Sequence, residues 1–333
     1  MRLRYLTPFA FLALQPLGGW LGGAWTFLGA AATPLCLASL DAALGEEAAA
    51  AQWASGRGAR WLPRIYIFLQ LAATFWAAAW VARPATSLVE AAGMAVSTGV
   101  TTGVFGFVAA HEMIHSRDRR ERALGLALLG SALYMHFRIA HVYGHHRRAA
   151  TFEDSASARL GESLYAFLAR SVAGQFREAW VFEERRRRTG LGNRLVVYLA
   201  IEAAFLIAVA LVSLRALAFM FAVAVVAVAL LESFNYVAHY GLRRRAGEQL
   251  GPQHSWNSAR RMNNAALFNM GRHSDHHRLT TRPYERLEAL SGAAELPSGY
   301  AAALLTALVP PLWRRTMDPR AAAVQAASSA DTP

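Results

Sequence analysis

The sequence predicts an all-α membrane protein with about six transmembrane helices and a histidine-rich cap on the cytoplasmic side. Hydrophobic residues make up 55% of its 333 residues and charged residues only 17%, and several long runs carry no charge, which is typical of a bilayer protein. Nine of the eleven histidines fall in four short groups at or after the ends of these runs. We therefore expect a single membrane-embedded domain over residues 1–333, whose helices hold the histidines in place.

Six apolar segments are the expected spans. A helix that crosses the ~30 Å hydrocarbon core needs ~20 residues, and the first segment is shorter than that. We expect it to pair with the second segment as a helical hairpin broken at Gly22-Gly23. In chain order, the four segments within residues 1–110 are Pro8–Leu21, Gly22–Leu44, Trp61–Val81 and Ala85–Ala110, and the two around residues 195–238 are Leu195–Leu214 and Ala216–Ala238.

The arginines set the expected orientation. Dense groups such as Arg117–Arg122 and Arg185–Arg188 follow the fourth span, whereas the short loops on the other side carry only Arg83 and Arg215. The positive-inside rule then places both termini and every histidine group in the cytoplasm. This pattern predicts a multi-pass protein of the bacterial inner membrane.

The segments outside the spans are expected to form the cytoplasmic cap. Residues 111–194 carry the first two histidine groups, and residues 239–320 carry the others. Within them, Ala123–Ile139 is apolar but too short to span, so we expect it at the membrane interface or partly inserted. Leu160–Glu184 has the pattern of an amphipathic surface helix, and residues 321–333, rich in alanine and serine, are expected to form a loose tail.

The histidine spacing predicts two bound metal ions. His111 and His115 lie four residues apart at the end of the fourth span, so both can face one site on a helix. His141 and His145 repeat that spacing, and His146 adds an adjacent imidazole. Neighbouring helical residues point about 100° apart, so His145 and His146 do not easily bind the same ion.

The other two groups are His239, at the end of the sixth span, and the triplet His273, His276 and His277. Nine imidazoles shared by two ions give four or five each, which is more than tetrahedral zinc uses. Two irons with a position left open for dioxygen fit better. A di-iron carboxylate bundle is disfavoured, because it needs paired Glu-x-x-His motifs with further glutamates, and only Glu112–His115 has that form.

Acidic residues should accompany the histidines. Neutral imidazoles leave the metal charge uncompensated, so carboxylates are expected to hydrogen-bond the ligands. The candidates are Glu112, Glu153, Asp154 and Asp275. His136 and His254 lack a partner at ligand spacing, and we interpret both as structural or as contacts of the ligands.

At these residues the sequence resembles the integral-membrane alkane hydroxylases (alkane 1-monooxygenases), a branch of the histidine-rich membrane desaturase and hydroxylase superfamily. The resemblance covers most of the chain from His111 to Arg320. Besides the histidine groups it includes Tyr134–Ile139, Glu153–Arg159, Asn235–Leu242, His254–Ser258, Arg272–His277, Pro297–Tyr300, Pro310–Trp313 and Met317–Arg320.

The resemblance implies a non-haem di-iron centre that inserts one oxygen atom of dioxygen into a terminal C–H bond of a linear alkane. Electrons would come from NAD(P)H through a reductase and rubredoxin. The implied iron ligands are His111, His115, His141, His145, His146, His239, His273, His276 and His277. Some positions depart from the family pattern: Ala140 and Ala238 replace usual glutamates, Ser116 replaces a usual lysine, and Met270-Gly271 replace a common Leu-Gln.

Composition agrees with an external electron donor. The single cysteine, Cys36, excludes a cysteine-ligated redox cluster within the chain. The arginine-rich cytoplasmic face would attract an acidic donor, although positive-inside topology alone also explains these arginines. An alkane dissolves in the bilayer, so a channel among apolar spans is a sensible route for such a substrate.

Alternative functions stay open at this point. His111–His115 is also a literal His-Glu-x-x-His, the signature of a zinc metalloprotease, but this function leaves seven histidines unexplained. A fatty-acyl desaturase or hydroxylase, or a methyl-aromatic (xylene-type) monooxygenase, keeps the fold and the metal and changes the substrate. A transporter or structural membrane protein would bind metal only incidentally.

Overall fold

The computed structural model describes residues 2–47, 59–187, 189–245 and 247–330. Five helical segments within them are long and apolar enough to cross a membrane: Gly23–Leu44, Leu62–Ala82, Leu88–Ile114, Arg194–Val212 and Leu214–His239. They match five of the six expected spans to within a few residues. The first expected span forms α1 (Thr7–Leu21), whose 15 residues are too few for a full crossing.

The expected hairpin at the N-terminus is confirmed. After α1 the chain turns at Gly22 and continues as the 3-10 turn η2 (Gly23–Phe27) and α2 (Leu28–Leu44). Gly22 and Gly23 have φ angles of 70° and 53°, a region that residues with a Cβ atom rarely adopt. α1 packs against both α2 and α3 (Leu62–Ala82).

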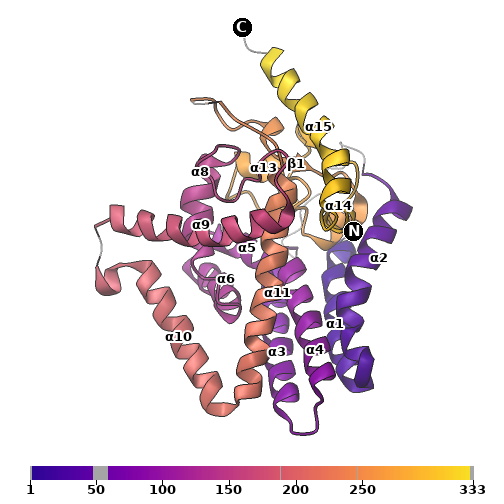
Figure 1. Ribbon diagram of the computed structural model, residues 1–333, viewed down its shortest axis with the longest axis vertical. Coiled ribbons are helices and arrows are strands. Elements are labelled where there is room, and N and C mark those ends of the chain that lie inside the picture. The colour runs from indigo at the N-terminus through magenta and orange to yellow at the C-terminus, as the bar shows by residue number, and fades with distance from the viewer. Residues whose placement is uncertain (1, 48–58, 188, 246, 331–333) are drawn as a thin grey trace.

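The span that carries the first histidine group is built from three parts. α4 (Leu88–Thr101) continues through a π-helical turn, η4 (Thr102–Gly106), into α5 (Phe107–Ile114). The side chain of Ser87 accepts a hydrogen bond from the backbone of Glu90 and caps α4. α11 (Leu214–His239) packs along α4 and η4, and both spans end beneath the cap, which comprises residues 115–187 and 240–330 (Figure 1).

The first part of the cap folds back on the spans. α6 (Arg119–Ser131) packs against α5, and at Gly125 a Cβ atom would lie 2.9 Å from the carbonyl oxygen of Ala110. The first half of the apolar segment that we expected at the interface, residues 123–131, is therefore the end of α6 and packs on α5. It is followed by α7 (Phe137–Ile139), the π-helical turn η5 (Ala140–His145) and α8 (His146–Arg148).

The predicted surface helix is confirmed as α9 (Leu164–Arg185). It lies across the ends of the long helices, and α10 (Arg194–Val212) diverges from them (Figure 1). The inward face of α9 is partly polar, because Ser171, Gln175 and Glu183 are all buried.

The C-terminal part of the cap consists of short elements. β1 (Trp256–Asn257) pairs in parallel with β2 (Ala294–Glu295). The helices are α12 (Arg261–Ala266), α13 (His273–Arg278) and α14 (Tyr300–Ala307). The remaining 3-10 turns of the chain are η1 (Arg2–Leu6), η3 (Ala59–Trp61), η6 (Gly190–Gly192), η7 (Pro252–His254) and η8 (Tyr284–Arg286).

One expectation about the C-terminus was wrong. Residues 321–333 were expected to form a loose tail, but α15 runs from Pro310 to Ala330, and residues 331–333 lie outside the described residues. Alanine has the highest helix propensity, and this helix also has tertiary contacts. Ala321 is fully buried, and the side chain of Gln325 donates a hydrogen bond to the carbonyl of Gly241.

Candidate metal centre

The structure brings the nine histidines of the four sequence groups together as two adjacent clusters. The five-histidine cluster contains His111, His115, His141, His146 and His276, and the four-histidine cluster contains His145, His239, His273 and His277. Within each cluster, one ring nitrogen from every member lies within 4.8 Å of the others. His136 and His254 belong to neither cluster, as expected.

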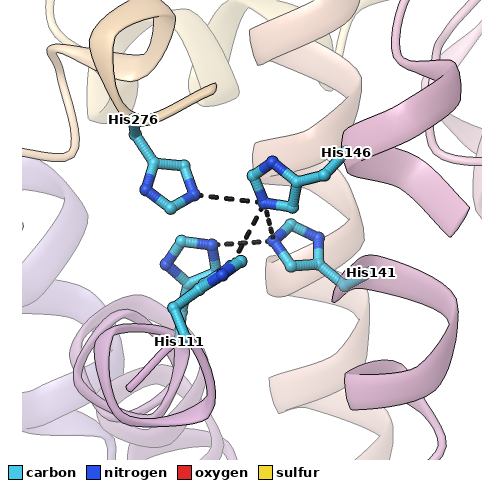
Figure 2. A group of neighbouring side chains, drawn as sticks. His111, His141, His146 and His276 are labelled. Atoms are coloured by element: carbon cyan, nitrogen blue, oxygen red, sulfur yellow. Dashed lines mark hydrogen bonds between the residues drawn. The ribbon is translucent and has the colours of Figure 1, made fainter. Parts of the chain in front are cut away.

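In the five-histidine cluster the Nε2 atoms converge on a common point (Figure 2). The Nε2 atoms of His111 and His141 are 2.8 Å apart. The Nε2 atom of His146 lies 3.0 Å from that of His141, 3.1 Å from that of His115 and 3.2 Å from that of His276. Five imidazole nitrogens around one small volume form a ready-made set of metal ligands.

The four-histidine cluster has the same character. Nε2 of His273 lies 3.2 Å from Nε2 of His239 and 3.1 Å from Nε2 of His277. The ring of His145 lies 4.7 Å from the ring of His239. The two clusters touch, because the rings of His146 and His277 are 4.6 Å apart.

The π-helical turn η5 decides which histidines of the second group share a cluster. His145 and His146 belong to different clusters, as their adjacency predicted. His141 shares its cluster with His146 and not with His145, although the four-residue spacing suggested the latter. Residues 140–145 form a π-helical turn, in which hydrogen bonds join residues five apart. The wider turn brings His146 to the same ligand group as His141, while the ring of His145 stacks on the ring of His141.

Burial favours the neutral form of six of the nine clustered imidazoles. Burial lowers the pKa values of His115, His141, His146, His273 and His277, and the neighbouring histidines lower them further. The pKa of His276 falls to about 3 for the same reason. Neutral imidazole is the form that binds a metal ion, so the clusters are prepared for metal over the physiological pH range.

Two hydrogen-bond contacts, one with a carboxylate and one with a backbone carbonyl, orient two histidines of the four-histidine cluster. Nδ1 of His145 lies 2.8 Å from Oδ2 of Asp154, and Nδ1 of His239 lies 3.2 Å from the carbonyl oxygen of His254. Burial alone would raise the pKa of Asp154, but its contacts with His145 and Ser157 lower it to about 2. The carboxylate of Asp154 is therefore ionised and accepts a hydrogen bond from the protonated Nδ1 atom of His145.

The other three candidate acids have different contacts. Glu112 accepts a hydrogen bond from the backbone nitrogen of Tyr284 at 3.2 Å. Asp275 forms ion pairs with Arg278 and Arg282. Glu153 is exposed. Of the four acids singled out in the sequence, Asp154 is the one that the structure places in hydrogen-bond contact with a clustered histidine. The contact of the His254 carbonyl with His239 agrees with the interpretation of His254 as a contact of the ligands.

Three of the positions that depart from the family pattern are tightly packed. Ala140 and Ala238 are buried, so a glutamate there would need a polar partner inside the protein. At Gly271 a Cβ atom would lie 2.3 Å from Oδ1 of Asn264 and 2.6 Å from the carbonyl oxygen of Ser258. A larger residue at 271 therefore requires the neighbouring asparagine to move.

An apolar cavity of about 220 Å³ reaches both clusters. His111 and His141 of the five-histidine cluster and His273 of the four-histidine cluster form part of its wall. The rest of the lining is mostly aliphatic and aromatic and comes from α2, α4, η4, α5, α11 and α14: Pro34, Leu37, Val100, Val104, Phe107, Val108, Leu230, Leu231, Phe234, Leu304, Leu305 and Leu308 are among its residues.

A second pocket of about 360 Å³ is polar and adjoins His115. Four arginines line it together with Glu112 and Glu121; they are Arg60, Arg64, Arg117 and Arg282. The five-histidine cluster thus borders an apolar cavity and a polar, arginine-rich pocket.

Comparison with known proteins places this arrangement in a family. A family model described as fatty acid desaturase matches residues 85–306. Alkane 1-monooxygenase 1 of Pseudomonas aeruginosa is 41% identical over 246 residues, which cover 70% of this chain and 64% of that protein. Alkane 1-monooxygenase 2 of Alcanivorax borkumensis is 35% identical over 265 residues, covering 76% and 69%. The chain belongs to the fatty acid desaturase family, in its alkane 1-monooxygenase branch.

Another relative has a lower identity to this chain. The hydroxylase component of the xylene/toluene monooxygenase of Pseudomonas putida is 29% identical over 231 residues, which cover 67% of this chain and 62% of that protein. The chain spans about two thirds of the length of these desaturase-family relatives. The match to the family model takes in all four histidine groups of this chain, from His111 to His277.

Proposed function

We propose that this protein is an alkane 1-monooxygenase, which uses dioxygen to hydroxylate the terminal methyl group of linear alkanes to primary alcohols. The observation that carries this proposal is the apolar cavity whose wall contains His111, His141 and His273. An unbranched hydrocarbon offers no polar handle, so it is held by shape and apolar contact alone. A cavity between membrane helices that ends at two histidine clusters suits such a substrate.

Two iron ions are the proposed cofactor. The nine clustered imidazoles fit such a site, because their donor nitrogens gather in two groups and all of them except that of His146 are buried. Imidazole suits iron as well as zinc, copper and nickel, but a cluster of five histidines exceeds the four ligands that zinc usually takes. One ion would be held by the five-histidine cluster and the other by the four-histidine cluster. When bound, iron would supply the dioxygen chemistry needed to break a strong C–H bond.

The chain's own residues would position the substrate and exclude water. Phe107 and Val108, one helical turn before His111, form the wall of the cavity beside the cluster. A methyl group pressed against that wall would be directed at the histidines, and the apolar lining would keep bulk water away. Asp154 would fix the orientation of His145 through its Nδ1 atom.

Rubredoxin, reduced by NAD(P)H through a reductase, is the proposed electron donor. The single cysteine, Cys36, cannot form a redox cluster, so electrons would come from outside or from a bound cofactor, and a separate donor protein is the source that we propose. The polar pocket beside His115 is a suitable place for an acidic donor, because Arg117 in its wall is exposed. Arginines around an opening attract a negatively charged partner and raise its association rate.

The proposed location is the bacterial inner membrane, with both termini and the histidine clusters in the cytoplasm. The arginine-rich segments of the cap support this orientation. It would also give a cytoplasmic electron donor access to the pocket beside His115.

A product assay tests the function directly. Cells that lack endogenous alkane oxidation would express the chain with a rubredoxin and its reductase and receive octane, hexadecane, xylene and a fatty acid separately. We expect primary alcohols from the alkanes, and no product from cells that express His273→Ala at the same membrane level. Product from xylene or the fatty acid alone would overturn the proposal and would favour the xylene-type or the desaturase alternative.

A further inference from the structure

A buried carboxylate in α11 accepts hydrogen bonds from two other segments of the chain and from its own helix. Glu232 is fully buried. Its Oε1 atom accepts a hydrogen bond from the hydroxyl of Tyr134 at 2.9 Å. Its Oε2 atom accepts bonds from Ser171 at 2.5 Å, from Gln175 at 2.6 Å and from Asn235 at 3.3 Å. An acid inside a membrane span is costly and is usually retained for a function, yet Glu232 does not line the apolar cavity.

Tyr134 is the first ring of a stack that ends in both histidine clusters. The rings of Tyr134 and Phe137 are 5.8 Å apart and inclined by 21°. Phe137 stacks on His141 at 4.6 Å and 20°, and His141 stacks on His145 at 5.1 Å and 22°. His141 belongs to the five-histidine cluster and His145 to the four-histidine cluster. Four nearly parallel rings thus connect the carboxylate of Glu232 with both clusters.

The turn that carries Tyr134 is also held from a second helix. Leu133 has a φ angle of 57°, which is unfavourable for a residue with a branched side chain. The backbone nitrogen of Met135 donates a hydrogen bond to the carboxylate of Glu202 in α10 at 2.8 Å. The carboxylates of Glu202 in α10 and Glu232 in α11 therefore both bond to this turn. Together they hold the Tyr134 ring in place just ahead of α7.

His141 needs such support more than some of its neighbours. A metal-binding histidine is usually oriented by a hydrogen bond from its second ring nitrogen. His145 has this bond with Asp154, and His239 has it with the carbonyl of His254. Among the described residues, Nδ1 of His141 is buried and has no hydrogen-bond partner. The face of its ring, however, is covered by Phe137 on one side and His145 on the other.

We propose that Glu232 is a positioning residue, which sets the ring plane of His141 through Tyr134 and Phe137. The proposal rests on the proposed function only in that the five-histidine cluster holds a metal ion. Loss of the Tyr134 hydroxyl would free the ring stack without changing a ligand, and Tyr134 itself does not line the substrate cavity, although Phe137 does. The metal in the five-histidine cluster would then be bound more weakly and in a less regular geometry.

The test compares two variants that each remove one buried tyrosine hydroxyl. Tyr134→Phe removes the bond to Glu232. The matched control, Tyr236→Phe, removes a buried bond of 2.7 Å to the carbonyl of Glu162, which has no part in the stack. Both proteins would be purified in detergent, loaded with Co²⁺ in place of iron, and examined by visible absorption and by competition with a chelator. These measurements report the metal geometry and affinity without any turnover.

We expect the wild type and Tyr236→Phe to bind two Co²⁺ ions with the same spectrum. Tyr134→Phe should change the spectrum of one ion and weaken its binding roughly tenfold or more. Removal of a residue that orients a metal ligand usually has an effect of this size. Phe137→Leu should have the same effect, and the double variant Tyr134→Phe/Phe137→Leu should be no worse than Phe137→Leu alone, because both act through one stack.

Three outcomes would overturn the proposal while leaving the function intact: an unchanged spectrum and affinity in Tyr134→Phe, an equal change in Tyr236→Phe, or strictly additive effects in the double variant. Failure of the wild type to bind two ions would instead contradict the proposed metal centre. The two failures are therefore distinguishable.

Discussion

The Nδ1 atom of His145 and the Oδ2 atom of Asp154 lie 2.8 Å apart, and both side chains are almost completely buried. A carboxylate in this position selects the tautomer of the imidazole and leaves Nε2 free for a metal ion. We expect Asp154→Asn to weaken metal binding by the four-histidine cluster about 10- to 100-fold. Chelator competition on the purified protein would measure this loss. Asp118→Asn, at an exposed acid that caps α6, is the control and should bind both ions normally.

The far end of the apolar cavity should set the longest alkane that fits. Val100 lies eleven residues before His111 on the same span, which corresponds to about 16 Å along a helix. We expect Val100→Phe to reduce turnover of long alkanes more than that of short ones, by about 1 to 3 kcal/mol for each methylene that no longer fits. Val225→Phe, on a lipid-facing position that is 69% exposed, should leave the chain-length profile unchanged. If Val100→Phe also left the chain-length profile unchanged, the assignment of this cavity as the alkane-binding site would be contradicted.

The rate at which the electron donor reduces the protein should depend on the pocket beside His115. We expect Arg117→Glu to slow reduction by rubredoxin, and the difference from the wild type should shrink as salt is added, because ions screen exposed charges. Arg177→Glu makes the same charge change in another polar pocket, which contains none of the nine histidines, and should have a much smaller effect. Stopped-flow reduction at several ionic strengths would measure both. Equal slowing by the two variants would indicate a general effect of surface charge.

The sequence was sufficient for much of this architecture, because long apolar runs and histidine spacing are local signals. The five long helices, the Gly22-Gly23 hairpin and α9 all follow from them. The pairing of His141 with His146 did not, since a π-helical turn has no clear sequence signature. Glu232 was also missed, because its contacts come from segments far apart in the chain, whereas His254 was expected to be structural or to contact the ligands, and its carbonyl does contact His239. The helix at residues 321–330 was missed because alanine and serine suit a tail as well as a helix.

Glu183 should link stability to pH. Its side chain is buried and bonded to Arg186 and Arg194. Burial alone would raise its pKa, but the bonds with Arg194 and Arg186 lower it below the usual value of 4.5. Because the pKa is lower in the folded state than in the unfolded state, the ionised carboxylate stabilises the fold above the unfolded-state pKa. This contribution is lost as the pH falls through the lowered pKa of the folded state. We expect Glu183→Gln to cost about 2 kcal/mol at pH 7, and the difference in thermal unfolding should disappear as pH falls below 4.5.

The metal content of the purified protein tests the central claim most directly. Protein extracted from membranes in mild detergent, without added metal, would be analysed by inductively coupled plasma mass spectrometry against its amino-acid content. The two clusters predict two iron ions per chain, and loss of both His141 and His145 should remove iron from each cluster. A single zinc ion per chain, retained by His111 and His115 alone, would contradict the account.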